Sequence, residues 1–255
     1  MKNLFRIAVA LLAVVTVMSQ IQTAGSAEIK VLSTTALKTT LDELAPQFER
    51  VTGNKIVASY EPAARITKRI VNGEVRDVVI ITGADVESLI KQGKVVAGSS
   101  ANIARSVAGL AVQKGAPKPD ISSAEKFKQT LLAAKSIAIS SGQTGAHMAK
   151  VFDQLGIVET LKPKIIKGKG GAEDFIGLYL VRGEADIGIH QMPALMAVPG
   201  INIVGPLPSE MQLVTIFAAG LSSTAKETSA GRSLINFLLT PAAIAILKSK
   251  GLEPR

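Results

Sequence analysis

Strand-like and helix-like segments alternate along this chain in two separate runs, and a chain with this pattern has few ways to fold. Short apolar or alternating segments predict strands, and apolar residues spaced three or four apart predict helices. The first run has strands at 28–33, 55–60 and 77–82 and helices at 37–48, 64–71 and 85–92. The second run has strands at 136–140, 164–166 and 185–190 and helices at 146–155 and 172–181. Such alternation is typical of βαβ units, so we expect an α/β fold with two lobes, each a mainly parallel sheet flanked by helices.

Two further strand-like segments, 107–112 and 212–218, lie where the chain passes between the two runs. We therefore expect the chain to cross between the lobes twice. Two last helical patterns, at 230–239 and 241–250, follow the second crossing. We expect these helices to return and pack on the first lobe.

The N-terminal residues have the pattern of an export signal. Lys2 and Arg6 give a positive start, residues 7–18 form an apolar run, and residues 25–27 are the small residues that signal peptidase accepts. We expect cleavage after residue 27 and export to the periplasm. An apolar run this short does not span roughly 30 Å of hydrocarbon, which argues against an uncleaved anchor. With no cysteine to acylate, a lipoprotein tether is not expected either.

The composition limits the chemistry that is available. The absence of cysteine excludes disulfides, thiolate metal sites and cysteine nucleophiles. The formal charge is +9, and removal of Lys2 and Arg6 leaves about +7. The basic residues are scattered, there is no Trp and there are two Tyr, so a nucleic-acid partner is not expected. A basic surface can steer small anions toward a cleft, and simple solubility is the alternative explanation.

Several segments resemble the periplasmic molybdate-binding proteins of ABC importers. They are the first strand and turn at 29–37, the end of the first helix at 48–53, the segment 183–188, and the C-terminal segments 237–243 and 251–252. The resemblance covers nearly the whole mature chain. It implies a type II periplasmic-binding-protein-like fold, in which two α/β lobes joined by two crossover strands clamp a ligand between them. It also implies that lobe 1 is 28–108 plus 215–255 and that lobe 2 is 109–214.

Polar or glycine-rich turns precede helices at four places, 33–36, 61–65, 140–145 and 168–172. In open parallel sheets, ligands bind beyond the carboxyl ends of the strands, where such turns lie. The first N–H groups of a helix have no partner within it and carry partial positive charge, so they bind anions. Each turn alone is also explained by ordinary capping or turn formation, and the prediction depends on several turns facing one cleft. The candidate ligand-binding residues are Thr34, Thr35, Ala36, Ala63, Arg65, Ser141, Thr144, Gly145, Gly171, His190 and Gln191.

The chain departs from the molybdate binders at the turns that the resemblance assigns to the ligand. Ala36 stands where the family typically has a serine, residues 61–64 replace a serine-rich loop, and Gln191 replaces a common tyrosine. A pocket with fewer hydroxyl donors suits a tetrahedral oxyanion poorly, so we favour an organic carboxylate, with a molybdate-like oxyanion left open. Arg65 is a candidate partner because a guanidinium makes two parallel hydrogen bonds to a carboxylate. A surface ion pair with Glu61 is the alternative role for Arg65.

The sequence carries no recognisable catalytic or metal-binding motif. His147 and His190 are the two histidines and lie far apart, so no metal and no cofactor are expected. Ser140 and Ser141 are not part of a G-x-S-x-G elbow, and no second carboxylate accompanies Asp186 at a telling interval. We therefore expect a protein that is not an enzyme. His190 ends a predicted strand at the cleft, where it either donates to the ligand or makes a structural hydrogen bond.

Together these features predict a periplasmic solute-binding protein of an ABC importer. It would act as a monomer, capture a small anion by lobe closure at hinges near 107–112 and 215–218, and deliver it to a permease in the inner membrane. One alternative is a ligand-sensing periplasmic subunit that presents the bound solute to a membrane receptor. A less favoured alternative is an enzyme on the same two-lobe fold.

Overall fold

The computed structural model describes residues 26–169 and 175–254, so most of the expected export signal (1–25) and Gly171 lie outside the described residues. The strands are β1 Glu28–Thr34, β2 Lys55–Glu61, β3 Val78–Thr82, β4 Ala101–Gln113, β5 Ile137–Ile139, β6 Ile165–Lys167, β7 Ile187–Gln191, β8 Ile201–Pro206, β9 Val214–Leu221 and β10 Glu253–Pro254. The α-helices are α2 Lys38–Thr52, α3 Ala63–Val71, α4 Gly83–Lys91, α5 Ala124–Ala133, α6 Gln143–Gln154, α7 Val158–Leu161, α8 Gly177–Val181, α9 Met192–Met196, α10 Thr228–Phe237 and α11 Pro241–Ser249. Short 3-10 helices are η2 Thr35–Leu37, η3 Lys162–Lys164 and η5 Ser209–Met211.

The strands follow one another in the order β2-β1-β3-β9-β4-β7-β5-β6. In the first half of this order, β1 lies parallel between β2 and β3, with Val31 opposite Ala58 on one side and Val78 on the other. β9 is antiparallel to β3. Every residue of β3 is buried, as expected for a continuous apolar run inside a sheet that is covered on both faces. Because β1, β2 and β3 are parallel, their carboxyl ends lie at the same edge of the sheet.

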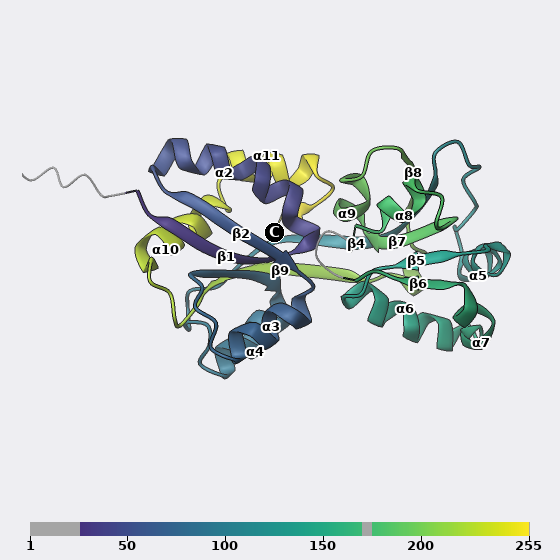
Figure 1. Ribbon diagram of the computed structural model, residues 1–255, viewed down its shortest axis with the longest axis horizontal. Coiled ribbons are helices and arrows are strands. Elements are labelled where there is room, and N and C mark those ends of the chain that lie inside the picture. The colour runs from purple at the N-terminus through teal and green to yellow at the C-terminus, as the bar shows by residue number, and fades with distance from the viewer. Residues whose placement is uncertain (1–25, 170–174, 255) are drawn as a thin grey trace, which may run out of the picture.

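β4 belongs to both halves of the molecule. Its residues up to Val107 pair with β9, and those from Ala108 onward pair with β7 and β8. In the second half, β5 lies parallel between β6 and β7. β4 and β9 run side by side between the halves in Figure 1, and they are the two segments that were predicted to cross. The exact lobe boundaries, 28–108 with 215–255 and 109–214, stay a prediction.

Helices cover both faces of each sheet. On the first sheet, α2, α10 and α11 bury one apolar cluster that includes Phe48, and α3 and α4 bury another that includes Ile66 on the opposite face. On the second sheet, α5 and α6 bury a cluster around Phe127, and α8 and α9 cover a cluster that includes Leu180. The ring of Phe237 in α10 lies 5.3 Å from the ring of Phe48 in α2. The two C-terminal helices therefore pack on the first half, as predicted.

The predicted α/β class is confirmed by this strand order and helix placement. α6 begins at Gln143, earlier than the predicted start at 146. Of the helix predicted at 172–181, the described part is α8, which begins at Gly177. α5, α7, α9, β8 and β10 were not predicted from the sequence. α5 buries only Phe127 and Leu131, and α9 is five residues long, so neither produces a strong apolar period.

Within the described ranges, no single helix is long and apolar enough to cross a membrane. Together, α10 and α11 have the length and apolar composition that a membrane span requires, but a bend of 64° separates the two helices. Both helices contribute to the buried apolar cluster over the first sheet.

Candidate ligand-binding cleft

A small cavity of about 30 Å³ lies where the two halves of the molecule meet. One wall comes from the ends of β1 and β3 and the start of α3, the other comes from β5, α6 and β7, and β9 adds residues between them. The lining residues are Thr34, Thr35, Ala36, Pro62, Ala63, Thr82, Ser140, Gly142, Gln143, Thr144, His190, Gln191, Thr215 and Phe217. Both halves therefore contribute to the wall of one cavity.

Among the described elements, five helices begin at this cavity. The N-cap residues of η2 (which continues into α2), α3, α4, α6 and α9 all line it, and they are Thr34, Pro62, Thr82, Gly142 and Gln191. The hydroxyl of Thr82 accepts a hydrogen bond from the N–H of Asp85 and so caps α4. In the described structure, the other four N-cap residues make no side-chain cap. The first N–H groups of those four helices therefore keep their partial positive charge, directed toward the cavity.

Three buried side-chain oxygens that line the cavity have no hydrogen-bond partner within residues 26–169 and 175–254. They are Thr35 Oγ1, Ser140 Oγ and Gln191 Oε1. The three residues are 3%, 2% and 4% exposed, so solvent does not satisfy them freely. Because buried polar groups are nearly always hydrogen-bonded, three such atoms around one cavity indicate a site for a polar ligand.

His190 lies at the end of β7 and is 5% exposed. Its Nδ1 lies 2.6 Å from the backbone nitrogen of Gln191 and accepts that N–H. In the neutral ring the proton is therefore on Nε2, which makes Nε2 a hydrogen-bond donor. The imidazole thus adds a donor to the cavity wall.

None of the described lining residues is Asp, Glu, Lys or Arg. An anion in this cavity would be held by N–H groups and hydroxyls instead of by a formal positive charge. Arg65 is not brought to the cavity. Its Nε lies 3.4 Å from Glu61 Oε2, and 57% of its side chain is exposed. Glu61 also receives a hydrogen bond from Arg69, so α3 carries a surface ion-pair network outside the cleft.

Of the residues predicted from the sequence, the structure brings seven together around the cavity. They are Thr34, Thr35, Ala36, Ala63, Thr144, His190 and Gln191. Gly171 lies outside the described residues, and Ser141 and Gly145 line a neighbouring hollow. The contact of any of these residues with a ligand stays a prediction.

Seven lining residues were not among the candidates. Pro62, Ser140, Gly142 and Gln143 lie in the turns singled out at 61–65 and 140–145, whereas Thr82, Thr215 and Phe217 lie outside those turns. Thr82 ends a predicted strand directly before a helix, which is the same signal that selected Thr34. Thr215 lies on a predicted crossing strand, and a crossing strand necessarily passes the junction of the lobes. Phe217 carries no such signal, because a buried aromatic residue on a strand is ordinary core.

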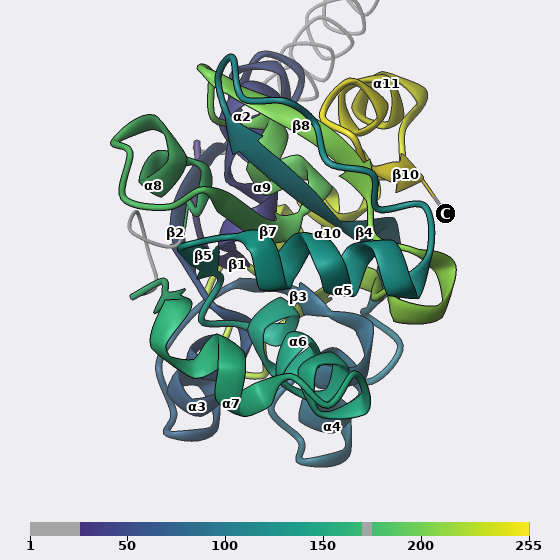
Figure 2. The ribbon, with the colours of Figure 1, turned by 90° about the vertical axis from the view of Figure 1, so that its right-hand side faces the viewer.

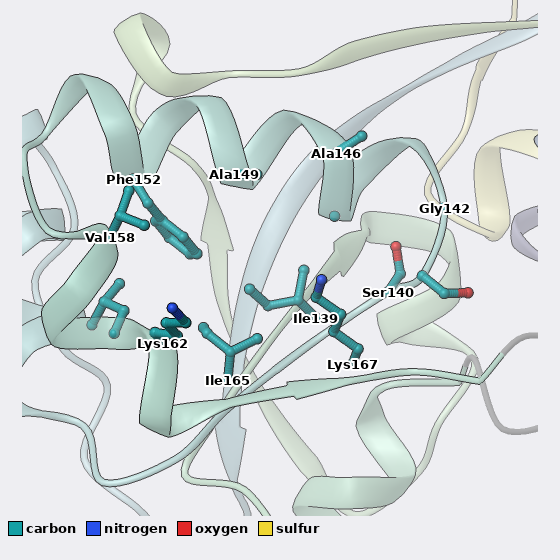
Figure 3. A pocket seen from close by; sticks show the side chains of 13 residues that line it. Ile139, Ser140, Gly142, Ala146, Ala149, Phe152, Val158, Lys162, Ile165 and Lys167 are labelled. Atoms are coloured by element: carbon teal, nitrogen blue, oxygen red, sulfur yellow. The ribbon is translucent and has the colours of Figure 1, made fainter.

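The neighbouring hollow has a volume of about 600 Å³ and lies within the second half, between α6 and β6 (Figure 3). Figure 2 shows α6 and α7 together on that side of the molecule. Ser140 and Gly142 line both spaces, whereas Ser141 and Gly145 line only the hollow. A Cβ on Gly145 would lie 2.1 Å from the carbonyl oxygen of Ser140, so only glycine fits there. Close backbone packing is therefore sufficient to explain this glycine.

The described residues contain no group of three or more His, Cys, Asp or Glu side chains that could hold a metal ion. The side-chain oxygens of the cavity wall belong to hydroxyls and to the amides of Gln143 and Gln191, which are weak ligands for transition metals compared with imidazole and thiolate. We therefore consider the cavity as a site for an anion.

Two α/β halves that share a small cavity with polar residues in its wall and are joined by two strands define a solute-binding protein with the type II periplasmic-binding fold. The chain belongs to the family described as bacterial extracellular solute-binding protein, which matches residues 29–253. The predicted family resemblance is thus confirmed.

Among curated proteins, the chain is 32% identical over 230 residues to an aconitate isomerase from a Pseudomonas species, covering 88% of this chain and 87% of the relative. It is 26% identical over 238 residues to the molybdate-binding protein ModA of Azotobacter vinelandii, covering 89% and 90% of the two chains. One of these relatives is named as a binding protein and the other as an enzyme, so the family does not by itself exclude catalysis.

Solved structures agree on the fold. The periplasmic molybdate-binding protein of Azotobacter vinelandii has a TM-score of 0.71 at 24% identity, covering 88% of this chain and 98% of the other. The sulfate-binding protein SubI of Mycobacterium tuberculosis H37Rv has a TM-score of 0.70 at 18% identity, covering 89% and 87%.

Proposed function

We propose that this solute-binding protein captures a small organic carboxylate in the cleft between its halves and delivers it to the permease of an ABC importer in the inner membrane. The observation that supports this most is the convergence of four helix N-termini without side-chain caps on a cavity lined by no charged residue. Such ends bind anions through N–H groups and the helix dipole. The unpartnered hydroxyls of Thr35 and Ser140 add two further donors.

The size of the cavity indicates how the ligand enters. A volume of about 30 Å³ accommodates one or two oxygen-sized groups, enough for a single carboxylate but not for a whole di- or tricarboxylate. The halves must therefore separate further to admit a larger acid. Rotation about β4 and β9, the two strands that connect the halves, provides that motion, and a ligand that contacts both walls favours the closed form.

Thermal unfolding against a panel of anions tests the proposal. The panel contains molybdate, tungstate, sulfate, phosphate, and mono-, di- and tricarboxylates that include both aconitate isomers. A ligand at a hundred times its Kd adds about 2.7 kcal/mol, which for a chain of this size raises Tm by about 5 to 11 °C. Stabilisation by a carboxylate supports the proposal. Stabilisation by molybdate or tungstate alone would replace the carboxylate with an oxyanion, and no shift with any anion would end the proposal.

A second candidate function is isomerisation of an unsaturated acid such as aconitate. It is favoured by the 32% identity to an enzyme of that name and by His190, the one imidazole among the described lining side chains. Removal of a proton from one carbon and its return to another leaves the composition of the acid unchanged. For His190 to act as this base, its Nδ1 must first release the N–H of Gln191, so that the ring can present an unprotonated nitrogen to the substrate. Incubation of each isomer with catalytic amounts of protein, followed by NMR, decides between the two functions. Conversion that is lost in His190→Asn supports the isomerase, whereas binding without conversion supports the transport protein.

We further propose that the mature protein begins at Glu28 and acts in the periplasm. The positively charged start, apolar run and small residues before position 28 support this. Cell fractionation and N-terminal sequencing test it. A cytoplasmic protein that retains Lys2 and Arg6 would contradict it.

A further inference from the structure

Gln191 ends β7 and is the N-cap residue of α9, and its side chain lies inside the cleft wall. It is 4% exposed. Its amide Nε2 lies 3.0 Å from Thr215 Oγ1 and 3.4 Å from Thr144 Oγ1. Both hydrogens of the amide are therefore directed at hydroxyl groups of the protein.

The orientation of the Gln191 amide is fixed by a second hydrogen bond, the one that Thr215 makes to Gln143. Thr215 Oγ1 donates to Gln143 Oε1, at 3.1 Å. A hydroxyl has one proton, so Thr215 can only accept from Gln191. The amide nitrogen of Gln191 must then face Thr215, and its oxygen must face away. That oxygen, Oε1, is buried and has no hydrogen-bond partner in the described part of the chain.

Gln191 Oε1 differs from the other unpartnered atoms of the cleft. The hydroxyls of Thr35 and Ser140 can each turn a proton toward an anion. An amide oxygen has no proton and can only accept. An anion whose oxygens all lack protons would place an oxygen against Gln191 Oε1. Neither of these two oxygens can donate a hydrogen bond, so both would stay unpaired in a buried site. An anion that carries a hydroxyl or retains a proton can donate to it.

We infer that Gln191 makes the cleft selective for anions that also offer a hydrogen-bond donor, such as 2-hydroxy acids, over anions of the same shape and charge that do not. This inference rests on the proposed function, since it concerns the same cleft. It names Gln191 as the residue that discriminates, with Thr215 and Gln143 as positioning residues that hold its amide in one orientation.

Matched pairs of ligands test the inference in the full mature chain. Isothermal titration at pH 7 compares the two ligands of each pair. Malate and succinate, like citrate and tricarballylate, differ by one hydroxyl. Phosphate and sulfate differ because phosphate retains a proton at this pH. The hydroxyl- or proton-bearing member of a pair should bind at least about tenfold more tightly, because its absence leaves a buried acceptor unpaired. Equal affinities, or tighter binding of the member without the donor, overturn the inference and leave the proposed function intact. Absence of binding to every member overturns both.

Variants identify the atom that is responsible. Gln191→Met keeps the length of the side chain and removes Oε1, so the ratio of affinities within a pair should fall to about one. Gln143→Ala releases the proton of Thr215, which lets the Gln191 amide turn over, and the ratio should fall there as well. Gln129→Ala, on the exposed surface of α5, is the matched control and should keep the wild-type ratio. If Gln191→Met keeps the wild-type ratio of affinities within a pair, the inference is overturned. If Gln191→Met does not fold, the same result in Gln143→Ala overturns it.

Discussion

The cleft between the halves and the hollow beside α6 share Ser140 and Gly142 but differ in size and chemistry. The hollow is about 600 Å³ and the cleft about 30 Å³, and the walls of both are mainly carbon. The polar groups of the cleft include the buried side chains of Thr35, Thr144 and Gln191, whereas those of the hollow include the amines of Lys162 and Lys167. Volume alone would favour the hollow, whereas the convergence of buried polar groups favours the cleft.

The two spaces also differ in how they could attract negative charge. Lys162 and Lys167 line the hollow, and both residues are exposed. Exposed amines attract anions weakly because water and salt screen them. The cleft has no formal charge, but its helix ends and hydroxyls are buried, where each hydrogen bond to an anion is stronger. The comparison thus predicts that substitutions in the cleft change anion binding and that similar ones in the hollow do not.

The largest expected effect comes from a negative charge in the cleft. Thr35→Asp places a carboxylate of similar size at the first residue of η2. An acidic residue at a helix N-terminus is favourable, so we expect the variant to fold and to occupy the anion site with its own side chain. Affinity for the ligand should fall by at least about 100-fold, measured by isothermal titration.

Two controls separate charge from shape and the cleft from the hollow. Thr35→Asn keeps the size and a donor, and should lose no more than about tenfold in affinity. Ala149→Asp introduces the same charge into the wall of the hollow and should leave affinity unchanged. If Ala149→Asp abolished binding and Thr35→Asp did not, the hollow would be the anion site.

The sequence predicted most of the fold because both lobes use strong local signals. The buried run of β3 and the apolar stripe of α2 each have a clear period, and the predicted strands lie close to their observed positions. α9 was missed because a five-residue helix that follows a strand directly has no period of its own. The start of α6 was missed because Gln143 and Thr144 belong to a polar turn by composition, yet the structure includes them in the helix.

The sequence pattern accounts for part of the cavity wall. The turns before helices place Thr34, Thr35 and Thr144 around one cavity, because strand ends and helix starts fix the backbone. The direction of a long side chain depends on its neighbours and is not fixed by such a pattern. Arg65 was expected at the ligand for its chemistry, but Glu61 one turn earlier holds it at the surface. The hydrogen-bond chain through Thr215 requires β9 and β7 to be placed in space, which no local pattern provides.

A smaller effect is expected from removing one hydroxyl from the cleft. Thr35→Val has nearly the same shape and lacks Oγ1, so ligand affinity should fall by about 5- to 150-fold. Thr40→Val is the matched control. Thr40 lies on α2, is 1% exposed, and also has a buried hydroxyl without a partner in the described structure. Unlike Thr35, it does not line the cleft. That control should retain wild-type affinity with equal or higher Tm. Equal losses in the two variants would mean that packing of α2, and not contact with the ligand, is responsible.

The smallest expected effect is that of Arg65→Ala, and it sharpens the comparison between cleft and surface. Because the side chain is 57% exposed and its guanidinium is paired with Glu61, its removal should weaken ligand binding by no more than about threefold, through loss of a screened charge. The loss should disappear when the titration is repeated at high salt, since exposed charges are then screened. Arg76→Ala removes another charge of the same sign near α3 and serves as the control. A loss of tenfold or more that persists at high salt would mean that Arg65 leaves Glu61 and enters the cleft when ligand is present, as its chemistry suggested from the sequence.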